Sequence, residues 1–355
     1  MNEDYIEDIE ADEMEGELFE KEVFEHFRYV VDKGQTLVRI DKYLVNTMAG
    51  ISRNRIQEAA DIGNIRVNEK SVKSNYRVKP FDVITIHLEY PPSEFEIYPQ
   101  DIPINIVYED EDIILVNKQP GLVVHPGFGN FDGTLLNAIA WHLKDQPEYD
   151  VNDSRIGLVH RIDKDTSGLL LLAKTPYAKT HLGKQFFDKT THRRYQAVVW
   201  GNVKQDEGTI IGALARNPQD RMQFMVFPEG ENPLAKHAVT HYKVLERLGY
   251  VSLIECRLET GRTHQIRVHT KHIGHTIFND ERYGGHIILK GNTTAMYKAF
   301  VKNCFYLCPR QALHAKELGF VHPRTGEYMF FNSDLPQDMQ ELVDKWRKYG
   351  QKGEE

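Results

Sequence analysis

A proline-rich stretch, EYPPSEFEIYPQDIP, runs from Glu89 to Pro103 and separates two parts of the chain with different patterns. Four of its fifteen residues are proline, a composition typical of an extended, semi-rigid linker. The chain has 355 residues, which is room for two or three domains of ordinary size. We therefore expect a small module before the linker and a larger domain after it.

The segment before the linker, from about residue 36 to 90, has the pattern of a small mixed module. Apolar residues at helical spacing, among them Ile40, Leu44 and Met48, predict a first helix. A second helix is expected over RNRIQEAADI, with Ser52 as its N-cap and Gly63 as its end. The runs NIRVNEKSV and DVITIHL predict short strands.

Charge is unevenly distributed along the chain, although its net value is only −8. Residues 1–25 contain twelve Asp or Glu and one Lys, a net of −11, so the remaining 330 residues carry +3. The acidic start is typical of a solvated, disordered tail, with the covering of a basic surface as the alternative. From Thr36 to Leu88, by contrast, there are nine Lys or Arg and five Asp or Glu.

The segment RIDKYL…SRNRIQEAADIGNIRVNEKSVKSNYRVKPFDVITI resembles the RNA-binding module of ribosomal small-subunit protein four over about 55 residues. Two glycines usual in that family are absent, at Glu69 and Phe81, which puts the shapes of two turns in question. The resemblance implies a small α/β module that holds RNA through phosphate contacts, with a solvated surface of mixed charge as the alternative. The candidate contacts are Arg39, Lys42, Arg53, Arg55, Arg66, Lys70 and Lys73.

Beyond the linker, strand-like runs dominate and helical stretches lie between them. INIVYEDEDIILVNK, GLLLLAK, RRYQAVVWG and YVSLIECRL predict strands, whereas GTLLNAIAWHLK and TPYAKTHLGKQFFDK predict helices. We predict an α+β domain with a mixed, largely antiparallel sheet flanked by helices.

The absence of long apolar runs and the small number of cysteines bear on cellular location and on metal binding. No apolar run approaches the ~18 residues that span a bilayer, and the acidic N-terminus lacks an apolar signal core, so we expect neither membrane insertion nor export. Three cysteines are consistent with a reducing cytosol. We expect Cys304 and Cys308 to be core residues rather than metal ligands, because no partner pair completes a site of four.

The stretch GLVHRIDKDTSGLLLLAKT places two carboxylates, Asp163 and Asp165, among basic residues before an apolar strand. A calcium loop would need an acid at its twelfth position, which is Lys174, so we exclude that interpretation. A DxDx[TS] loop of the haloacid dehalogenase type of phosphatase fits the spacing and is kept as a weaker alternative. Against it, VHRI is half basic, and no later pair of adjacent aspartates completes a magnesium site.

HRIDKDTSG also resembles the central motif of the RluA-type pseudouridine synthases, and four further motifs of that family occur in order. They are VNKQPGLVVHPG (Val116–Gly127), RRYQAVVWG (Arg193–Gly201), LETGRTHQIRVHTKHIGHTIFNDERYG (Leu258–Gly284) and LHAKELGFVHPRTGEYMFF (Leu313–Phe331). The likeness spans about residues 100 to 337. Its departures, Ile162 for the commoner Leu and GHTIFND for GHPIVGD, touch no catalytic position.

This resemblance implies a role for each of several residues. Asp163 is the catalytic carboxylate, Arg267 is its cationic partner, and Tyr195 is the base and stacking surface. Arg262 is the nearby alternative to Arg267 as that partner.

Other residues of the motifs have more passive implied roles. Ile266 is implied as an apolar wall, and Arg161 as the residue that holds the gap left by an extruded uridine. The resemblance implies no role for Asp165, which is expected to be incidental. Three histidines are expected to be structural: His125, His160 and His264.

We therefore predict an RNA pseudouridine synthase that isomerises uridines in RNA, foremost large-subunit ribosomal RNA or its assembly intermediates. The family's reaction involves no oxidation or phosphate transfer, so no metal or other cofactor is expected. A non-catalytic RNA-binding protein that kept the fold is a further alternative, against which the intact set of implied catalytic residues argues. We expect a cytoplasmic, monomeric, bacterial protein. The expected segments are an acidic tail (1–30), an RNA-binding module (31–90), a linker (91–103), a catalytic domain (104–340) and a charged C-terminal tail (341–355).

Overall fold

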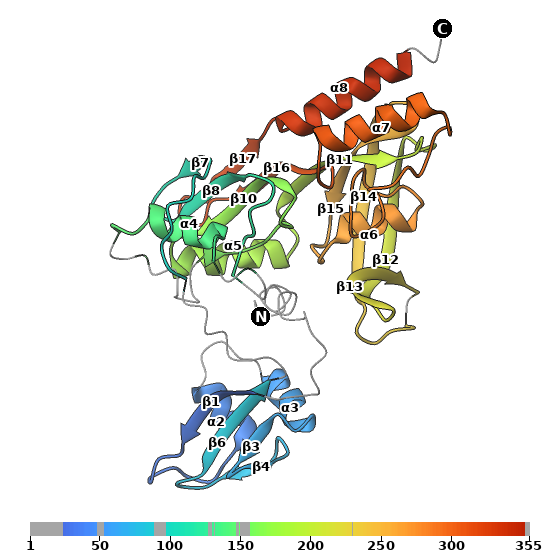
Figure 1. Ribbon diagram of the computed structural model, residues 1–355. Helices are drawn as coiled ribbons and strands as arrows, with labels where there is room; N and C mark the ends of the chain where they lie inside the picture. The colour runs from blue at the N-terminus through green and yellow to red at the C-terminus, as the bar shows by residue number, and fades with distance from the viewer. Residues whose placement is uncertain are drawn as a thin grey trace. The chain divides into compact units, whose positions relative to one another are not determined.

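The computed structural model describes residues 24–47, 53–88, 97–126, 130, 132–146, 149, 157–228 and 230–351. The chain divides into two compact units, one ending at Glu96 and one beginning at Ile97. Figure 1 shows the first unit in blue and the second from green to red. The tail predicted at the N-terminus falls, as far as residue 23, outside the described residues.

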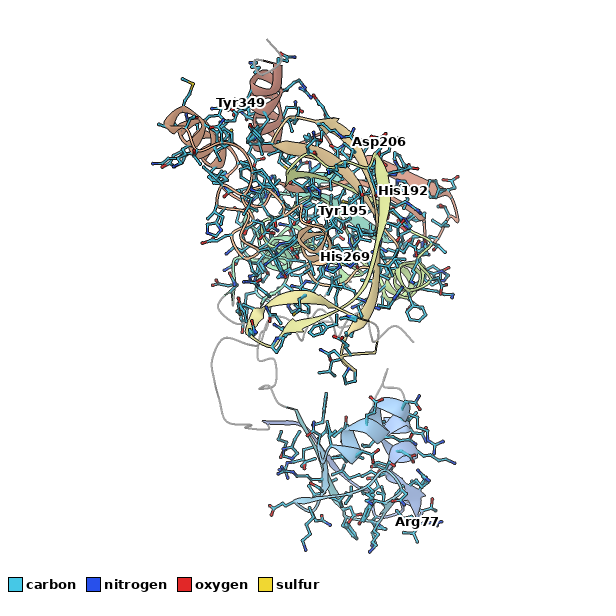
Figure 2. The ribbon with its side chains drawn as sticks, turned by 90° about the vertical axis from the view of Figure 1, so that its right-hand side faces the viewer. Arg77, His192, Tyr195, Asp206, His269 and Tyr349 are labelled. Atoms are coloured by element: carbon cyan, nitrogen blue, oxygen red, sulfur yellow. The ribbon has the colours of Figure 1, made fainter. Side chains whose placement is uncertain are left out.

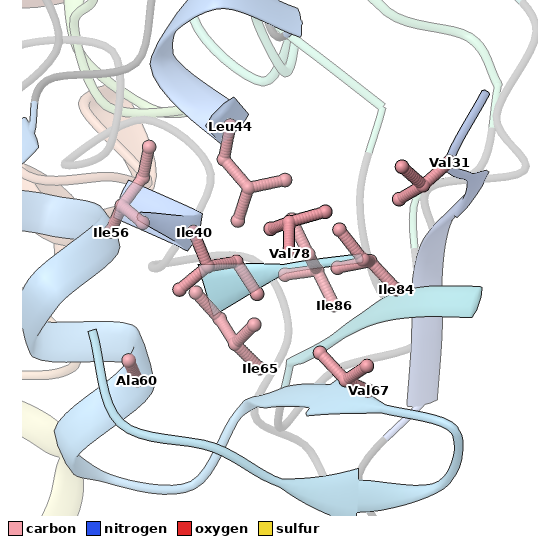
Figure 3. Close-up of a cluster of buried hydrophobic side chains, with 10 residues drawn as sticks. All are labelled: Val31, Ile40, Leu44, Ile56, Ala60, Ile65, Val67, Val78, Ile84 and Ile86. Atoms are coloured by element: carbon pink, nitrogen blue, oxygen red, sulfur yellow. The ribbon is translucent and has the colours of Figure 1, made fainter. Parts of the chain in front are cut away.

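The first unit combines a four-stranded antiparallel sheet with two helices. The strand order is β1 (Phe24–Val30), β6 (Val83–Leu88), β3 (Ile65–Val67) and β4 (Lys70–Ser71). A short pair, β2 (Val38–Arg39) with β5 (Arg77–Val78), accompanies α2 (Ile40–Thr47) and α3 (Arg53–Asp61). Their apolar side chains form the core drawn in Figure 3: Val31, Ile40, Leu44, Ile56, Ala60, Ile65, Val67, Val78, Ile84 and Ile86.

Both helices and the short strands predicted for this unit are present. Gly63 follows α3 with a φ of +83°, the left-handed conformation that ends a helix, while Ser52 lies outside the described residues. The predicted tail of residues 1–30 is too long, because β1 pairs with β6 along its length. The acidic composition of the N-terminus obscured an aromatic and β-branched run, FEHFRYV, that favours a strand.

Two turns keep a left-handed backbone although neither position holds glycine. The φ angle is +69° at both Glu69 and Phe81, and +49° at Asn68. Asn68 Nδ2 donates to the Asp82 carboxylate at 3.0 Å, and the same carboxylate accepts the Lys79 N–H at 2.8 Å. These hydrogen bonds hold both turns against the strain of a left-handed residue that carries a Cβ.

The second unit is built on one large sheet. Its strand order is β13–β12–β14–β15–β11–β16–β10–β8–β7, with β17 beside β16 and β9 beside β10. Only the β10–β16 pair is parallel among the paired strands of the described residues, which confirms the predicted mixed, largely antiparallel sheet. The strands are β7 (Ile106–Glu109), β8 (Ile113–Lys118), β9 (Gly157–Leu158), β10 (Ser167–Ala173), β11 (His192–Trp200), β12 (Glu207–Asn217), β13 (Asp220–Phe227), β14 (Lys236–Arg247), β15 (Val251–Leu258), β16 (Leu313–Val321) and β17 (Tyr328–Asn332).

Helices flank this sheet on both faces. The helices are α4 (Leu135–His142), α5 (Pro176–Phe187), α6 (Gln265–His272), α7 (Ala295–Leu307) and α8 (Gln337–Gln351). On β11, Arg193 lies over the ring of Phe186 from α5, whereas Trp200 packs against Trp346 from α8. Since odd and even residues of a strand point to opposite faces, α5 and α8 cover opposite faces of the sheet.

Two predicted boundaries of the second unit are wrong. Residues 341–355 were expected to be a charged tail, but α8 extends to Gln351 and buries Met339, Leu342, Val343 and Trp346. That spacing gives an apolar stripe along one side of a helix. At the other boundary, Asn137 Nδ2 of α4 donates to the Tyr98 carbonyl at 2.9 Å. The last part of the predicted linker therefore belongs to the second unit.

The cysteines lie in the core, as predicted. All three cysteines are free and buried, and burial raises the pKa of the Cys304 and Cys308 thiols to about 12. Within the described residues, no helix is both long enough and apolar enough to cross a membrane.

Candidate active site

Asp163 lies in the loop between β9 and β10, near the middle of the large sheet. His160 anchors the start of this loop, because its buried Nε2 accepts the Leu171 N–H of β10 at 3.0 Å. Gly168 anchors its end with a φ of +113°, where a Cβ would collide with the Ala315 backbone of β16. Only glycine permits this close approach, so the loop leaves the sheet at a fixed point.

Arg267 on α6 binds two carboxylates at once. Its Nη1 donates to Asp163 Oδ2 at 2.8 Å, while Nε and Nη2 donate to the two oxygens of Asp280 at 2.7 and 2.9 Å. The ring of Tyr283 lies over the guanidinium, 4.9 Å away. The bidentate pair with Asp280 fixes the plane of the guanidinium and holds its remaining arm against Asp163. Arg262, the alternative partner, instead contacts the His237 carbonyl at 3.4 Å.

The charge state of Asp163 follows from this pairing. Burial by itself would raise its pKa, but His264, Arg267 and Arg161 together lower the pKa to about 2. Burial lowers the pKa of His264 to about 3, so that imidazole is neutral near pH 7. Arg267, with its direct hydrogen bond, is therefore the partner that keeps Asp163 ionised at neutral pH.

Tyr195 comes to the same region from β11. It pairs with Ala315 of β16, and Ala315 pairs in turn with Gly168 of β10, so these residues lie abreast on three adjacent strands. Adjacent strands are ~4.8 Å apart, which places the Tyr195 backbone about 10 Å from the end of the Asp163 loop. Its side chain is buried within the second unit, as Figure 2 shows.

A second layer of side chains holds the Asp163 loop from behind. Gln311 Nε2 donates to Thr166 Oγ1 at 3.0 Å and lies 3.5 Å from Asp163 Oδ2. Arg310 donates to the Asp165 carbonyl at 2.9 Å and to Ser167 Oγ at 3.2 Å. The loop is thus tied to the segment that leads into β16.

Lys118 holds the same loop from the opposite side. Its Nζ donates to the carbonyls of Gln119, Leu122 and Lys164 at 3.0, 2.9 and 2.7 Å. Burial lowers the pKa of Lys118 to about 7, although the nearby carboxylates of Asp165 and Asp163 oppose that shift. Three carbonyl acceptors and two nearby carboxylates favour the charged form of this buried amine.

Sequence reasoning missed several of these supporting residues. Lys118 and Asp280 lie inside the motifs VNKQPG and FNDERYG. Lys118 could have been singled out as a charge at the end of the apolar run IILV, whereas Asp280 is followed directly by Glu281 and Arg282 and carried no such signal. Arg310 and Gln311 precede the closing motif and carried no signal of their own. His264, expected to be structural, has a φ of +54°, and its Nδ1 hydrogen-bonds Tyr283 Oη at 2.8 Å.

The two remaining implied residues are close in sequence to Arg267 and to Asp163. Ile266 is buried beside Arg267 at the start of α6. Arg161 lies two residues before Asp163, is half-buried, and contributes to lowering the pKa of that carboxyl. Both positions are compatible with the roles that the resemblance implies, and neither role follows from the geometry alone.

The basic residues of the first unit fall into two groups. Arg39 and Arg53 both donate to the fully buried Asp41, at 2.9 Å in each case, so part of their charge serves the fold. Burial would raise the pKa of Asp41, but these hydrogen bonds, one from Gln57 and one from the Lys42 N–H lower it well below its ordinary value. Lys42, Lys70 and Lys73 are exposed and Arg66 is half-buried, whereas the side chain of Arg55 lies outside the described part.

The arrangement around Asp163 is that of a carboxylate in an ion pair rather than of a metal ligand. In the described parts of the chain, no three His, Cys, Asp or Glu side chains gather where they could hold a metal ion. A carboxylate oxygen already bonded to a fixed guanidinium is a poor ligand for magnesium, because the cation would have to displace it.

Comparison with known proteins identifies both units. The model of an RNA pseudouridylate synthase family matches residues 112–272, and that of the S4 domain matches residues 38–84. An RNA pseudouridine synthase of Chlorobaculum parvum is 47% identical over 89% of this chain and 96% of its own length. Ribosomal large subunit pseudouridine synthase D of Escherichia coli is 41% identical, covering 89% of this chain and 93% of its own.

A solved structure agrees at the level of the fold. Human RNA pseudouridylate synthase domain containing 4 superposes with a TM-score of 0.52 at 20% identity, covering 68% of this chain and 93% of its own. The identities above, over nearly the whole chain, exclude the phosphatase interpretation. The chain belongs to the RluA-type RNA pseudouridine synthases and carries an S4 domain before its catalytic domain.

Proposed function

We propose that this protein converts specific uridines of large-subunit ribosomal RNA to pseudouridine, with Asp163 as the catalytic carboxylate. The observation that carries the proposal is the ionised Asp163, hydrogen-bonded to an arginine that Asp280 holds in place. Relatives named ribosomal large subunit pseudouridine synthase D, which share 40–41% identity with this chain, support the substrate.

The chemistry needs one carboxylate and no redox step. The N1–C1′ bond of uridine breaks, the base turns and a C5–C1′ bond forms. The proton on C5 leaves, and N1 takes up a proton, so that the product is an isomer of the substrate. Positive charge develops on the ribose as the first bond breaks, and an ionised Asp163 stabilises or traps it. Arg267 keeps Asp163 in that state and oriented toward the ribose.

Other groups act on the base and on the surrounding RNA. Tyr195 stacks on the uracil and accepts the C5 proton, directly or through water. Ile266 walls the pocket with an apolar surface, and Arg161 occupies the gap that the extruded uridine leaves in the RNA. Arg262, which contacts the His237 carbonyl, binds the RNA backbone.

The S4 domain supplies affinity for structured RNA, and the catalytic domain supplies the reaction. Exposed lysines of the first unit, Lys42, Lys70 and Lys73, are its contacts to phosphates. The substrate is the ribosomal RNA or an assembly intermediate that contains it, which implies action in the cytoplasm of a bacterium. The protein acts as a monomer.

The test is to map pseudouridines in ribosomal RNA from cells with and without this protein. Sites that vanish in the deletion strain and return with the wild-type protein define the substrate. A large-subunit RNA with an unchanged pseudouridine map would contradict the assigned substrate, and the same map of transfer RNA would show whether that class is modified instead.

A further inference from the structure

One buried arginine beside the active site is paired with no carboxylate among the described residues. Among the described residues, three arginines are less than a tenth exposed: Arg193, Arg267 and Arg310. Arg267 binds Asp280 with two nitrogens, and Arg310 binds Asp338 in the same way, at 2.7 and 3.0 Å. Arg193, at 4% exposure, is bonded to no carboxylate within the part of the chain that the structure describes, and its Nε is buried without a partner.

This arrangement is costly unless something compensates it. A guanidinium does not lose its proton in a protein, so Arg193 cannot escape the cost of burial by becoming neutral. Within the described part of the chain, its guanidinium lies over the ring of Phe186, 5.4 Å away, and a cation–π contact offsets only part of the desolvation. An anion from outside the chain would complete the site.

Two described neighbours of Arg193, Phe186 and His160, carry no charge near pH 7. His160 stacks on the same Phe186 ring at 4.5 Å, and its Nε2 accepts a backbone N–H. Burial first, and then the charge of Arg193, lower the pKa of His160 to about 3, so this imidazole is neutral. A second polar group nearby is also unsatisfied, because the buried Thr191 Oγ1 has no hydrogen-bond partner among the described residues.

The strand places this site next to the base-binding residue. Arg193 and Tyr195 are two apart on β11, on the same face and ~6.7 Å apart along the strand. Arg194, between them, points to the other face, where its guanidinium lies 2.7 Å from Glu255 and 3.6 Å from Glu317. Arg193 therefore lies on the face of β11 that carries Tyr195, whereas the ion-paired Arg194 lies on the other face.

We propose that Arg193, assisted by Thr191, binds a phosphodiester group flanking the uridine that is turned over. The inference rests on the proposed function, since an RNA lying with one base against Tyr195 brings the phosphates of that nucleotide to this part of β11. A guanidinium offers two parallel donors that match two phosphate oxygens. The contact fixes the position of the ribose relative to Asp163, whereas contacts made by the S4 domain fix only the RNA as a whole.

The experiment pairs a change in the protein with a change in the RNA. The substrate is a ribosomal RNA fragment that the wild-type protein converts, made with a neutral methylphosphonate on the 5′ or the 3′ side of the target uridine. We expect one of these RNAs to react about tenfold more slowly, or worse, in single turnover with wild-type protein. Arg193→Met should convert native RNA about as slowly as wild-type protein converts that methylphosphonate RNA. The methylphosphonate should slow Arg193→Met little further.

Arg194→Met is the matched control, since it removes the neighbouring guanidinium from the opposite face. It should react like wild type on native RNA and keep the full sensitivity to the methylphosphonate. The inference is overturned if wild-type protein tolerates neutral linkages on both sides of the uridine, a result that does not depend on the folding of any variant. It is also overturned if the methylphosphonate slows Arg193→Met by the same factor as it slows wild-type protein. Native RNA left unconverted by wild-type protein would instead refute the proposed function.

Discussion

The two aspartates of HRIDKDTSG have different surroundings, and this difference supports our proposal that Asp163 is the catalytic one. Asp163 bonds a guanidinium that is itself fixed by Asp280, whereas Asp165 is held through its backbone carbonyl by Arg310. Sequence alone could name Asp163 and Arg267 only through the resemblance to a family. The two are 104 positions apart, and no periodicity connects a loop before one strand with a helix after another.

The pH dependence of the reaction should report the Arg267 pairing. The pKa of Asp163 is lowered from 3.8 to about 2, so the carboxylate is ionised throughout pH 5–8 and contributes no acid limb there. Its ionisation stabilises the fold above pH 3.8, and that contribution is lost as pH falls toward 2. Arg267→Lys leaves one ammonium to serve two carboxylates and should raise the pKa of Asp163.

Single-turnover rates between pH 4 and 8 check this prediction. Wild-type protein should show no fall at the acid end that is due to Asp163, and Arg267→Lys should acquire one. Superimposable profiles for the two proteins, after scaling, would mean that Arg267 does not set the charge state of Asp163.

A strained turn in the first unit gives a prediction for stability. Phe81 has a φ of +69° and is 64% exposed, so glycine there would relieve strain and lose little packing. The relief, of about 1–2 kcal/mol, exceeds the entropic cost of glycine, and we expect Phe81→Gly to stabilise the unit by roughly 0.5–1 kcal/mol. Hydrogen exchange of the β6 amides in the intact protein measures this. Lys79→Gly, two residues earlier in the same turn, should slightly destabilise the unit. A loss of protection in Phe81→Gly would contradict the expected relief of strain.

At the scale of elements, apolar and alternating runs located most strands and helices, but composition misled at both ends of the chain. Acidic residues hid β1, and charged residues hid the apolar stripe of α8, although both patterns are present in the sequence. The parallel pairing of β10 with β16 could not be foreseen, because the paired residues are 147 positions apart in the sequence and only the folding of the whole domain brings them together. The supporting residues Lys118 and Gln311 were missed for the same reason.

Helix α8, part of which was predicted to be a tail, is linked to the Asp163 loop through hydrogen bonds. Asp338 in its first turn binds Arg310 at 2.7 and 3.0 Å, and Arg310 holds the Asp165 carbonyl and Ser167 Oγ. Removing the charge of Asp338 leaves Arg310 free to shift the loop. We expect Asp338→Asn to lower the single-turnover rate at saturating RNA about tenfold, with RNA affinity nearly unchanged.

The control removes the other bidentate anchor of the same helix. Glu246 binds Arg347 of α8 at 2.8 and 2.6 Å and has no contact with the loop. Glu246→Gln should lower the melting temperature to a similar extent while leaving the rate within about twofold of wild type. If both variants slow the reaction equally, α8 acts only through general stability.

At the scale of the molecule, we propose that the first unit binds the RNA and the second carries out the reaction. Each phosphate contact releases counterions, so log affinity falls with log salt by ~0.7–0.9 per contact. Deleting residues 1–96 should weaken binding to structured ribosomal RNA and flatten this slope, with far less effect on turnover at saturating RNA. Because Arg53 is committed to Asp41, replacing Lys70 and Lys73 by Ala should flatten the slope more than replacing Arg39 and Arg53. An unchanged slope after deletion would contradict this division of work.

We propose that the protein isomerises uridine in RNA and that Asp163 is the one carboxylate that this reaction requires. The most direct test of this proposal is the release of tritium from ribosomal RNA labelled at C5 of uridine, with wild-type protein and two isosteric variants. Wild-type protein should release tritium without added nucleotide or metal, and Asp165→Asn should retain substantial activity. Asp163→Asn should bind the RNA with ordinary affinity and release none. Equal and complete loss in both variants, or release by Asp163→Asn at a rate near that of wild type, would contradict the account.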